Sequence, residues 1–433
     1  MKRSILIILT MVLGTIVGWA QEGAWSGELD IQGTKLSLVF HFDAEGCTMD
    51  SPMQGARGIR AEKSYTNEGK LVVKVPTIGA IYEGLYLGNM IVGTFTQGMA
   101  SLPLTLKPGA LETKRPQNPK APFPYTTEEV TFRNGDFVFN GTLTLPANCT
   151  DNTPAVVMVT GSGQQNRDEE LMDHKPFAVI ADALARGGIA SLRYDDRGWG
   201  DAAVPFYNYS TYDFLDDARA AISELRKRFK QVGVVGHSEG GTLAFMLASE
   251  GCPDFIVSLA GMVIPATQQM ILQNRAQLSV SGIGTEEVDT YCKALGELFA
   301  LITEGKSTAD FAVPAMSEAL DMNFRAAMKQ WLEIPYFTRF LSVDAGKDLH
   351  RIKCPVLALN GKKDLQVDWE PNLTMIDNNV KSPHEVVALE GMNHLFQHCQ
   401  TGALTEYQQI EETIAVEVLE KMITFIIESS KHK

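Results

Sequence analysis

Residues 236–240 read GHSEG, which places Ser238 between two glycines, directly after an apolar run and directly before a helix-like segment. A strand, a sharp turn and a helix in this order are typical of a nucleophile elbow, in which the turn exposes a serine hydroxyl. The flanking glycines remove side chains that would collide with the strand and the helix. The pattern predicts that Ser238 is a nucleophile, and the alternative is a tight turn with only a structural role.

A serine hydroxyl is a weak nucleophile, so it needs a base within hydrogen-bond reach and a carboxylate that orients the base. In proteins with such an elbow, the acid and then the histidine follow the serine, each in a loop after a late strand. Asp364 follows the apolar run 356–359, and His394 follows the run 386–389. These positions predict a triad of Ser238, His394 and Asp364.

Each partner of the serine has a nearby competitor. Asp368 lies further from the strand than Asp364 and could instead cap a helix that starts near Glu370. His398 lies four residues after His394 and is the main alternative base. The remaining histidines precede or abut the serine, lie on the wrong side of a late strand, or end the chain: His41, His174, His237, His350, His384 and His432.

Attack on a carbonyl builds negative charge on its oxygen, which backbone N–H groups must stabilise. One donor is expected to be the amide of Glu239, immediately after the nucleophile. The second is expected from the glycine-rich loop 160–163, where Ser162 is the first choice and Gly163 the next. Phosphate binding by this loop is the weaker alternative, because neither a GxGxxG pattern nor a Walker lysine is present. No cofactor or metal site is expected.

The run RYDDRG at residues 193–198 follows another strand-like segment and should lie near the same loops. We expect Asp195, Asp196 and Arg197 to have a structural role, in which charge pairs brace the elbow. Direct contact with a substrate is the alternative.

From about residue 125 the chain alternates apolar strand-like runs with segments of helical periodicity, which predicts a mainly parallel sheet covered by helices on both faces. Loops at the carboxyl edge of such a sheet carry the reactive groups. The expected helices are 177–185, 210–230, where Ser210 can provide the cap, and 242–248. The expected strands are 130–139, 141–145, 155–160, 189–194, 232–235, 255–259, 356–359 and 386–389.

Residues 262–350 are rich in Ala, Leu, Met and Glu and are expected to form a helical insert that acts as a lid. Its larger apolar residues can line a pocket or pack the insert's own core, and for most of them packing is the favoured interpretation. These residues are Met270, Leu272, Phe299, Leu301, Phe324, Trp331, Tyr336, Phe337 and Phe340.

The N-terminal part has a different organisation. Residues 1–20 combine early basic residues, a short apolar run and small residues before a cut after Ala20, which predicts a signal peptide and an exported protein, periplasmic or secreted, with no remaining membrane span. An uncleaved membrane anchor is the alternative. Residues 24–107 show short alternating runs and predict a small all-β domain. Residues 108–124 are proline-rich and predict an exposed linker, followed by the catalytic domain at 125–433.

The formal net charge of -14 argues against nucleic acid as a partner, because phosphate binding requires clustered Lys and Arg. The six cysteines are scattered and indicate neither a close-spaced disulfide framework nor a metal-binding CxxC pair.

At these motifs the sequence resembles bacterial serine hydrolases related to dienelactone hydrolase and to the catalytic domains of prolyl oligopeptidases, a branch that includes exported carboxylesterases. The resemblance extends from about residue 125 to the end of the chain. It implies an α/β-hydrolase fold and the same triad of Ser238, Asp364 and His394. The matching stretches are 160–168 (TGSGQQNRD), 193–198 (RYDDRG), 236–241 (GHSEGG), 360–367 (NGKKDLQV) and 391–397 (GMNHLFQ).

The resemblance leads us to expect hydrolysis of a small-molecule carboxylic ester, with an acylated carbohydrate as one candidate. A serine peptidase is the first alternative, although the β-propeller of related peptidases cannot fit within the first 125 residues. A thioesterase and a non-catalytic binding protein are further alternatives. Trp199 departs from the valine that is common in these relatives, which suggests a reshaped pocket.

Overall fold

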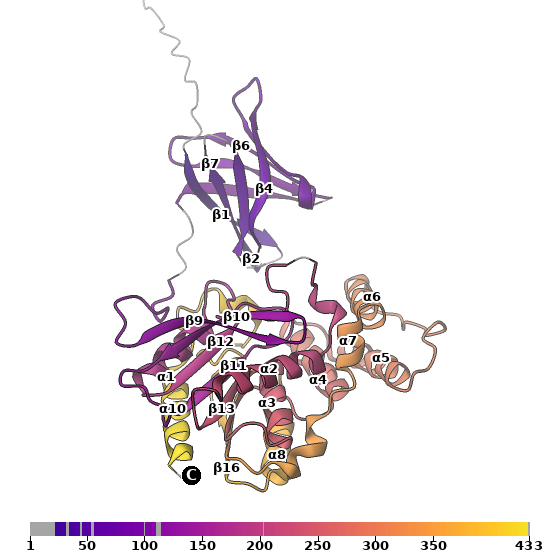
Figure 1. Ribbon diagram of the computed structural model, residues 1–433. Helices are drawn as coiled ribbons and strands as arrows, with labels where there is room; N and C mark the ends of the chain where they lie inside the picture. Colours follow the sequence, from indigo (N-terminus) through magenta and orange to yellow (C-terminus); the bar gives the residue numbers. More distant parts are fainter. Residues whose placement is uncertain are drawn as a thin grey trace, which may run out of the picture. The chain divides into compact units, whose positions relative to one another are not determined.

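The protein divides into two compact units between Glu112 and Thr113, and each unit is described by itself (Figure 1). The expected signal peptide lies outside the described part of the chain. The computed structural model describes residues 22–31, 34–43, 46–52, 56–98, 100–109, 114–201 and 203–431.

The first unit is a closed antiparallel barrel, in which each strand pairs with the next and β8 returns to β1. Alternate side chains fill its interior, where Trp25, Phe40 and Tyr82 are buried. The Tyr82 hydroxyl donates to the carbonyl oxygens of Ile91 and Leu104, so its polar end is satisfied inside the barrel. The strands are β1 (Gly23–Ile31), β2 (Thr34–Phe42), β3 (Cys47–Ser51), β4 (Ala56–Tyr65), β5 (Leu71–Val75), β6 (Ala80–Tyr86), β7 (Ile91–Gln97) and β8 (Ala100–Pro108).

The second unit contains an eight-stranded sheet with the strand order β16-β15-β14-β13-β11-β12-β10-β9. The pairs β9–β10 and β10–β12 are antiparallel, and the remaining neighbours are parallel. The strands are β9 (Thr126–Asn134), β10 (Phe137–Leu145), β11 (Ala155–Val159), β12 (Ala190–Tyr194), β13 (Val232–His237), β14 (Ile256–Leu259), β15 (Val356–Gly361) and β16 (His384–Leu389).

Two boundaries in this unit differ from those expected from the sequence. The chain turns between Asn134 and Phe137, not near residue 140, because Gly135 adopts the positive φ of +56° that a two-residue hairpin turn requires. The helix α2 begins after Ser210 as expected but ends at Leu225, before the predicted end at residue 230.

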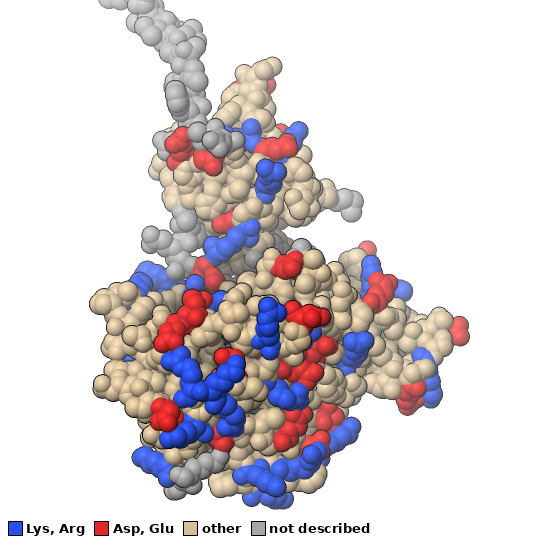
Figure 2. Space-filling model, in the orientation of Figure 1, with Lys and Arg blue, Asp and Glu red and all other residues tan. Residues whose placement is uncertain are grey.

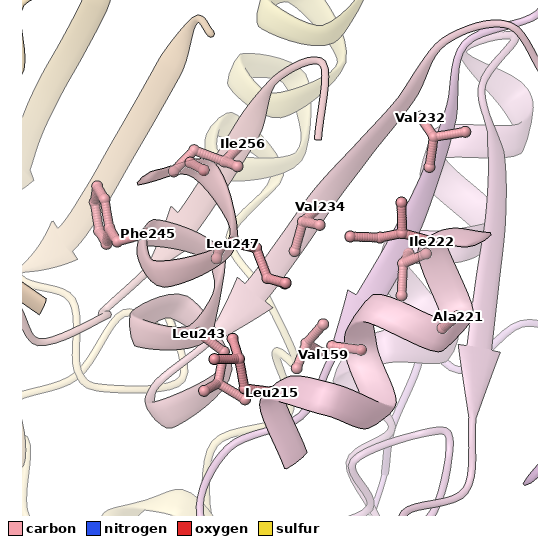
Figure 3. Close-up of a cluster of buried hydrophobic side chains, with 14 of the residues drawn as sticks. Val159, Leu215, Ala221, Ile222, Val232, Val234, Leu243, Phe245, Leu247 and Ile256 are labelled. Carbon is pink, nitrogen blue, oxygen red and sulfur yellow. The ribbon is translucent and has the colours of Figure 1, made fainter. Parts of the chain in front are cut away.

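Helices cover both faces of the sheet. The helices α2 (Thr211–Leu225), α3 (Glu239–Ser249) and α8 (Trp369–Asn379) pack on one face, where Leu215, Leu243 and Val234 meet in one apolar cluster (Figure 3). The helices α1 (Pro176–Arg186) and α10 (Val416–Ser430) cover the other face. The two faces hold the parallel strands so that their carboxyl ends lie along one edge.

Residues between β14 and β15 form a helical insert with its own apolar core, in which Tyr291, Phe299 and Phe324 are buried. The insert therefore packs largely on itself, as the sequence suggested for most of its apolar residues. Its helices are α4 (Ala266–Val280), α5 (Thr285–Thr303), α6 (Glu318–Glu333) and α7 (Pro335–Phe340), followed by the 3-10 helix η4 (Ala345–Arg351).

The prediction that residues 108–124 form an exposed linker is wrong at Arg115. This residue is 7% exposed, and its guanidinium donates to the carbonyl oxygens of Met172, Gln408 and Ile410 within the second unit. An arginine can satisfy several carbonyl groups at once because its five N–H donors form a rigid planar fork. The end of the linker is therefore an integral part of the second unit.

Two features of the described residues concern possible partners: the charge on the surface and the apolarity of the helices. The face in Figure 2 carries basic and acidic side chains interspersed with one another. Within the described part of the chain, no helix has the length and apolarity needed to cross a membrane.

Replacing Arg115 by alanine should lower the stability of the protein by about 1.5–3 kcal/mol, because several buried carbonyl oxygens lose a charged donor. The matched control is Lys114→Ala, since the neighbouring Lys114 is largely exposed and reaches Glu411 only at 3.8 Å. Urea denaturation of the intact chain would measure both variants. Equal midpoints for the two variants would contradict a structural role of Arg115.

Candidate active site

Ser238 lies on a strained turn between β13 and α3. Its backbone angles are φ 54° and ψ −118°, a conformation that a non-glycine residue rarely adopts. The turn is possible because the chain approaches itself very closely: a Cβ atom on Gly236 would lie 2.0 Å from the carbonyl oxygen of Gly240. A Cβ atom on Gly240 would likewise lie 2.0 Å from the carbonyl oxygen of Val159. Both flanking glycines are therefore required by the packing of α3 against the sheet.

Asp364 and His394 meet in the loops that follow β15 and β16. The Nδ1 atom of His394 lies 2.7 Å from Oδ2 of Asp364, and both side chains are almost completely buried. The other oxygen of Asp364 accepts hydrogen bonds from the backbone amides of Gln366 and Val367. The carboxylate is thus fixed on one side by the backbone and on the other by the imidazole, which holds the ring of His394 in one orientation.

Asp368 and His398 have other partners. The side chain of Asp368 accepts a hydrogen bond from the amide of Glu370 and caps α8, as anticipated for it in the sequence. His398 is exposed and lies within 2.9 Å of Glu412 and 3.1 Å of Glu417. None of these bonds joins Asp368 or His398 to His394 or Asp364.

Ser238 and His394 line the same cavity, which has a volume of about 440 Å³. Gly161, Ser162 and Glu239 also line it, so the loop after β11 and the start of α3 both reach the cavity. Glutamine side chains form much of its polar wall: Gln165, Gln269, Gln273 and Gln366.

The helical insert supplies much of the apolar wall. Five of its residues that the sequence analysis singled out line this cavity: Met270, Trp331, Tyr336, Phe337 and Phe340. Trp331 and Phe340 also belong to the insert's own apolar core, so lining a pocket and packing are not exclusive roles. Trp199 is 48% exposed and is not among the described residues that line the cavity, so the suggestion that it reshapes the pocket is wrong.

The loop after β11 is held by hydrogen bonds to two of its amides. The amide of Gly161 donates to Oε1 of Glu169 at 2.7 Å, and the amide of Gly163 donates to the hydroxyl of Tyr336 at 3.3 Å. The amide of Ser162 lies between these two and is taken by neither acceptor. Of the two amides expected from this loop as charge-stabilising donors, that of Gly163 is therefore already engaged within the protein.

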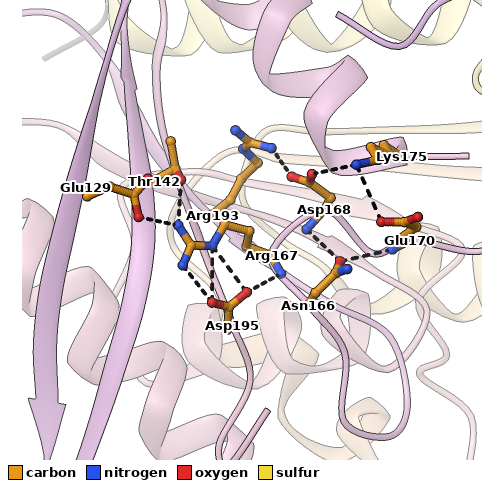
Figure 4. A network of polar contacts seen from close by, with 9 residues as sticks. All are labelled: Glu129, Thr142, Asn166, Arg167, Asp168, Glu170, Lys175, Arg193 and Asp195. Carbon is orange, nitrogen blue, oxygen red and sulfur yellow. Dashed lines mark hydrogen bonds and ion pairs between the residues drawn. The ribbon is translucent and has the colours of Figure 1, made fainter. Parts of the chain in front are cut away.

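Polar side chains hold the continuation of this loop, and Figure 4 shows the ion pairs among them. Asp196 accepts from the Thr160 hydroxyl and from the amide of Gln165, and Asp195 forms an ion pair with Arg167 at 2.6 Å. Asp195 and Asp196 thus have structural partners, as predicted, but they fix the loop 160–168 and not the elbow itself.

Arg197 and Arg193, which flank the two aspartates, are held in the same way. Arg197 pairs with buried Asp217 at 2.7 Å and stacks over the ring of Phe137. Arg193 pairs with Asp168, which also lies near Lys175 in the network shown in Figure 4. Buried charges of this kind are stable only with such close partners.

Glu169 and His237 form a second buried pair beside the cavity. Oε1 of Glu169 lies 2.9 Å from Nδ1 of His237, and Nε2 of His237 donates to the carbonyl oxygen of His394 at 3.0 Å. Burial lowers the pKa of His237, but the Glu169 carboxylate and the His394 carbonyl raise it by more, so the pKa lies above its ordinary value of 6.5. The pair therefore connects the loop after β11 with the loop that carries His394.

Glu239, directly after the serine, is a buried acid. Its carboxyl accepts a hydrogen bond from the hydroxyl of Tyr336. Burial raises the pKa of Glu239 above its ordinary value of 4.5, and the hydrogen bond from the Tyr336 hydroxyl lowers it by less. A carboxyl in this position is thus biased toward its neutral form.

Sequence reasoning missed three of these residues as parts of the site. His237 was set aside because it abuts the serine, and Tyr336 was grouped with the other aromatic residues of the insert. Glu169 follows directly after the recognised stretch 160–168, and its positive φ of 52° marks it as an unusual position only in the structure. The contact between Glu169 and His237 spans 68 residues of the chain and that between Tyr336 and Glu239 spans 97, which no local pattern indicates.

The sheet order, the serine on a strained turn from strand to helix, and the later Asp and His loops together define an α/β-hydrolase. The chain belongs to the family described as serine aminopeptidase, S33, whose model matches residues 173–398, more than half of the chain. The matched range contains Ser238, Asp364 and His394 but begins after the loop 160–163.

Individual relatives are more distant. The chain is 25% identical over 270 residues to the esterase EstD of Thermotoga maritima, covering 61% of this chain and 60% of that protein. Among solved structures it is similar to Est1E from Butyrivibrio proteoclasticus, with 13% identity and a TM-score of 0.41, covering 70% of this chain and 98% of that one. It is also similar to a dienelactone hydrolase from Anabaena variabilis, with 16% identity and a TM-score of 0.41 over 70% and 98% of the two chains.

The pair formed by Glu169 and His237 should make stability depend on pH. Because the folded protein raises the pKa of His237, the stabilisation from this proton is complete below pH 6.5 and is lost as the pH rises through the raised value. Glu169→Gln keeps an acceptor for Gly161 but removes the charge. The stability difference between wild type and this variant should be on the order of 1 kcal/mol near pH 6 and should shrink toward pH 9.

Denaturant midpoints measured across this pH range would test the prediction. The matched control is Glu170→Gln, because Glu170 also lines the cavity but pairs with Lys175 and not with a histidine. A difference between wild type and Glu169→Gln that stayed constant with pH would refute the linkage to His237.

Proposed function

We propose that this protein is a serine hydrolase that cleaves a small carboxylic ester through an acyl-enzyme intermediate, with Ser238, His394 and Asp364 as its triad. The observation that carries the proposal is the arrangement of these three residues: Ser238 on its strained elbow shares one cavity with His394, whose ring Asp364 holds through a 2.7 Å hydrogen bond. Family membership and the esterase relative support the same class of reaction.

In the proposed reaction, Oγ of Ser238 attacks the ester carbonyl carbon while Nε2 of His394 takes the hydroxyl proton. Asp364 accepts the hydrogen bond from Nδ1–H and stabilises the imidazolium that forms. When the tetrahedral intermediate collapses, the C–O bond to the alcohol breaks and His394 gives the proton to the departing alcohol oxygen. Water then attacks the acyl-enzyme by the same steps and releases the acid and the free serine.

The amides of Glu239 and Ser162 are the proposed donors to the negative oxygen. Glu239 is the first residue of α3, where the backbone N–H groups of the first turn have no partner within the helix. The amide of Ser162 lies between those of Gly161 and Gly163, which already donate hydrogen bonds within the protein. Ser162 and Glu239 both line the cavity. The amide of Gly163, our second choice from the sequence, is not proposed as a donor because it donates to Tyr336.

The cavity suggests the kind of ester. Trp331, Phe337 and Phe340 offer an apolar, aromatic surface for the acyl group, and the glutamines that also line the cavity offer hydrogen bonds to a polar alcohol such as a sugar. We propose that the insert acts as a lid over this space. We further propose that the protein is exported after removal of residues 1–20, which would expose it to small esters outside the cytoplasm.

An aminopeptidase is the second candidate, which the family description favours. Such an enzyme must bind the positive amino terminus of its substrate. The acidic side chains that line the cavity are Glu169, Glu170 and Glu239, and burial biases Glu239 toward its neutral form, which leaves Glu169 and Glu170 as the charged candidates. Glu169 is already bonded to Gly161 and His237, and Glu170 lies 3.5 Å from Lys175. Since both carboxylates have partners, the arrangement favours an ester over a charged peptide.

A fluorophosphonate probe should label the wild-type protein and fail to label Ser238→Ala, because the probe reacts with an activated serine hydroxyl. His394→Ala and Asp364→Asn should each lower kcat by about 10³- to 10⁴-fold. Two matched controls are available: His398→Ala and Asp368→Asn, which alter the neighbouring residues of the same types. If a control lost as much activity as its partner, the triad would be assigned to the wrong residues.

Substrate classes can be ranked by kcat/KM on p-nitrophenyl acyl esters of increasing chain length and on aminoacyl and dipeptidyl anilides. We expect the esters to be preferred by at least about 100-fold, because Glu169 and Glu170 on the cavity wall already pair with His237 and Lys175 and would have to give up these partners to bind an ammonium group. Preference for the anilides would instead identify a peptidase and overturn the proposed substrate.

A further inference from the structure

We propose that Tyr336 is a positioning residue of the oxyanion hole: its hydroxyl joins the Gly163 amide to the Glu239 side chain and so sets the distance between the two proposed donors. This inference rests on the proposed function, in which the amides of Ser162 and Glu239 stabilise the negative oxygen. It assigns to the helical insert a part in the chemistry that goes beyond covering the substrate.

The ring of Tyr336 is fixed from several sides. The residue lies on α7, is 2% exposed, and makes edge contacts with Phe206 and Phe337 at ring-centroid distances of 5.3 Å and 5.2 Å. Phe214 of α2 makes a further edge contact at 6.3 Å. Such close aromatic packing leaves the hydroxyl one direction in which to point.

That direction leads to both halves of the proposed oxyanion hole. The Tyr336 hydroxyl accepts a hydrogen bond from the Gly163 amide at 3.3 Å and donates its own proton to Oε2 of Glu239. Because this proton is given to Glu239, the hydroxyl contributes by holding other groups and not by binding the substrate oxygen.

The loop after β11 is thereby fixed on both sides of the Ser162 amide. On one side Glu169, from within the main body of the unit, holds the amide of Gly161. On the other side Tyr336, from the insert, holds the amide of Gly163, whose φ of +92° lies in a region that favours glycine. A donor between two fixed amides needs little reorganisation when charge develops, which is the condition for strong electrostatic stabilisation.

The backbone and the side chain of Glu239 have different roles. The amide begins α3 beside the nucleophile, while the carboxyl turns back to Tyr336. A negative charge on this carboxyl would oppose the developing oxyanion, and burial disfavours that charge because it raises the pKa of Glu239. The bond from Tyr336 holds the carboxyl in one position. One phenolic hydroxyl therefore coordinates the positions of both proposed donor residues.

The test compares Tyr336→Phe, which removes only the hydroxyl, with Tyr291→Phe. Tyr291 is an equally buried tyrosine of the same insert, but its hydroxyl faces Asn323 and it does not line the cavity. Titration with the fluorophosphonate probe would count the folded active sites in each sample. Turnover of p-nitrophenyl butyrate per titrated site then separates kcat from KM.

We expect Tyr336→Phe to lower kcat by about 10- to 100-fold, less than the loss of a donor itself, and to leave KM within about twofold. Its affinity for a trifluoromethyl ketone, which forms a tetrahedral adduct with an anionic oxygen, should fall by a similar factor. Tyr291→Phe should match the wild type in all three measurements.

The inference is overturned if Tyr336→Phe retains wild-type kcat and ketone affinity, or if both tyrosine variants lose the same amount, since a general packing defect would then explain the loss. Failure of the proposed function has a different signature, in which the wild-type protein itself is neither labelled by the fluorophosphonate nor active on any acyl substrate. That result would remove the basis of the inference as well.

Discussion

The close approach of α3 to the carboxyl edge of the sheet is the constraint on which the rest of the second unit depends. The backbone of Gly240 touches the end of β11, and that of Gly241 touches Gly261 after β14, at distances that leave no room for a side chain. This contact forces Ser238 into its strained conformation and brings the first turn of α3 beside the loop after β11. The cost of a strained residue, on the order of 1–3 kcal/mol, is offset by the apolar contacts that press α3 onto the sheet.

Around this contact the unit uses buried polar groups to order its loops. Asp196 and Arg167 act on the loop after β11, Asp364 acts on the loop after β16, and the pair of Glu169 and His237 joins the two loops. Loops at a sheet edge have few apolar contacts of their own, so hydrogen bonds with fixed directions are an effective way to hold them. The apolar layers determine where the loops begin, and the polar network determines where their backbone atoms lie.

Much of this could be predicted from the sequence, because the relevant signals are local. The position of Ser238 follows from the strand, glycines and helix around it, and Asp364 and His394 follow from their places after apolar runs. The alternation of strands and helices likewise predicted the layers of the second unit. Gly135 was overlooked as a turn residue, since the apolar run continued through it. Arg115 and Tyr336 could not be placed, because their roles depend on carbonyl, amide and carboxyl groups that reach them only in the folded chain.

The short helix α7 has two structural roles. Phe337 and Phe340 form part of the cavity wall, and Tyr336 binds the loop beside the serine. Changes at the two phenylalanines would alter the shape of the cavity, but both rings also pack against the ring of Tyr336 and help to hold its hydroxyl in place. The shape of the cavity can therefore vary at these two positions only with side chains that still support the tyrosine ring. Selection for new specificity and selection for rate would act on adjacent residues of the same six-residue segment.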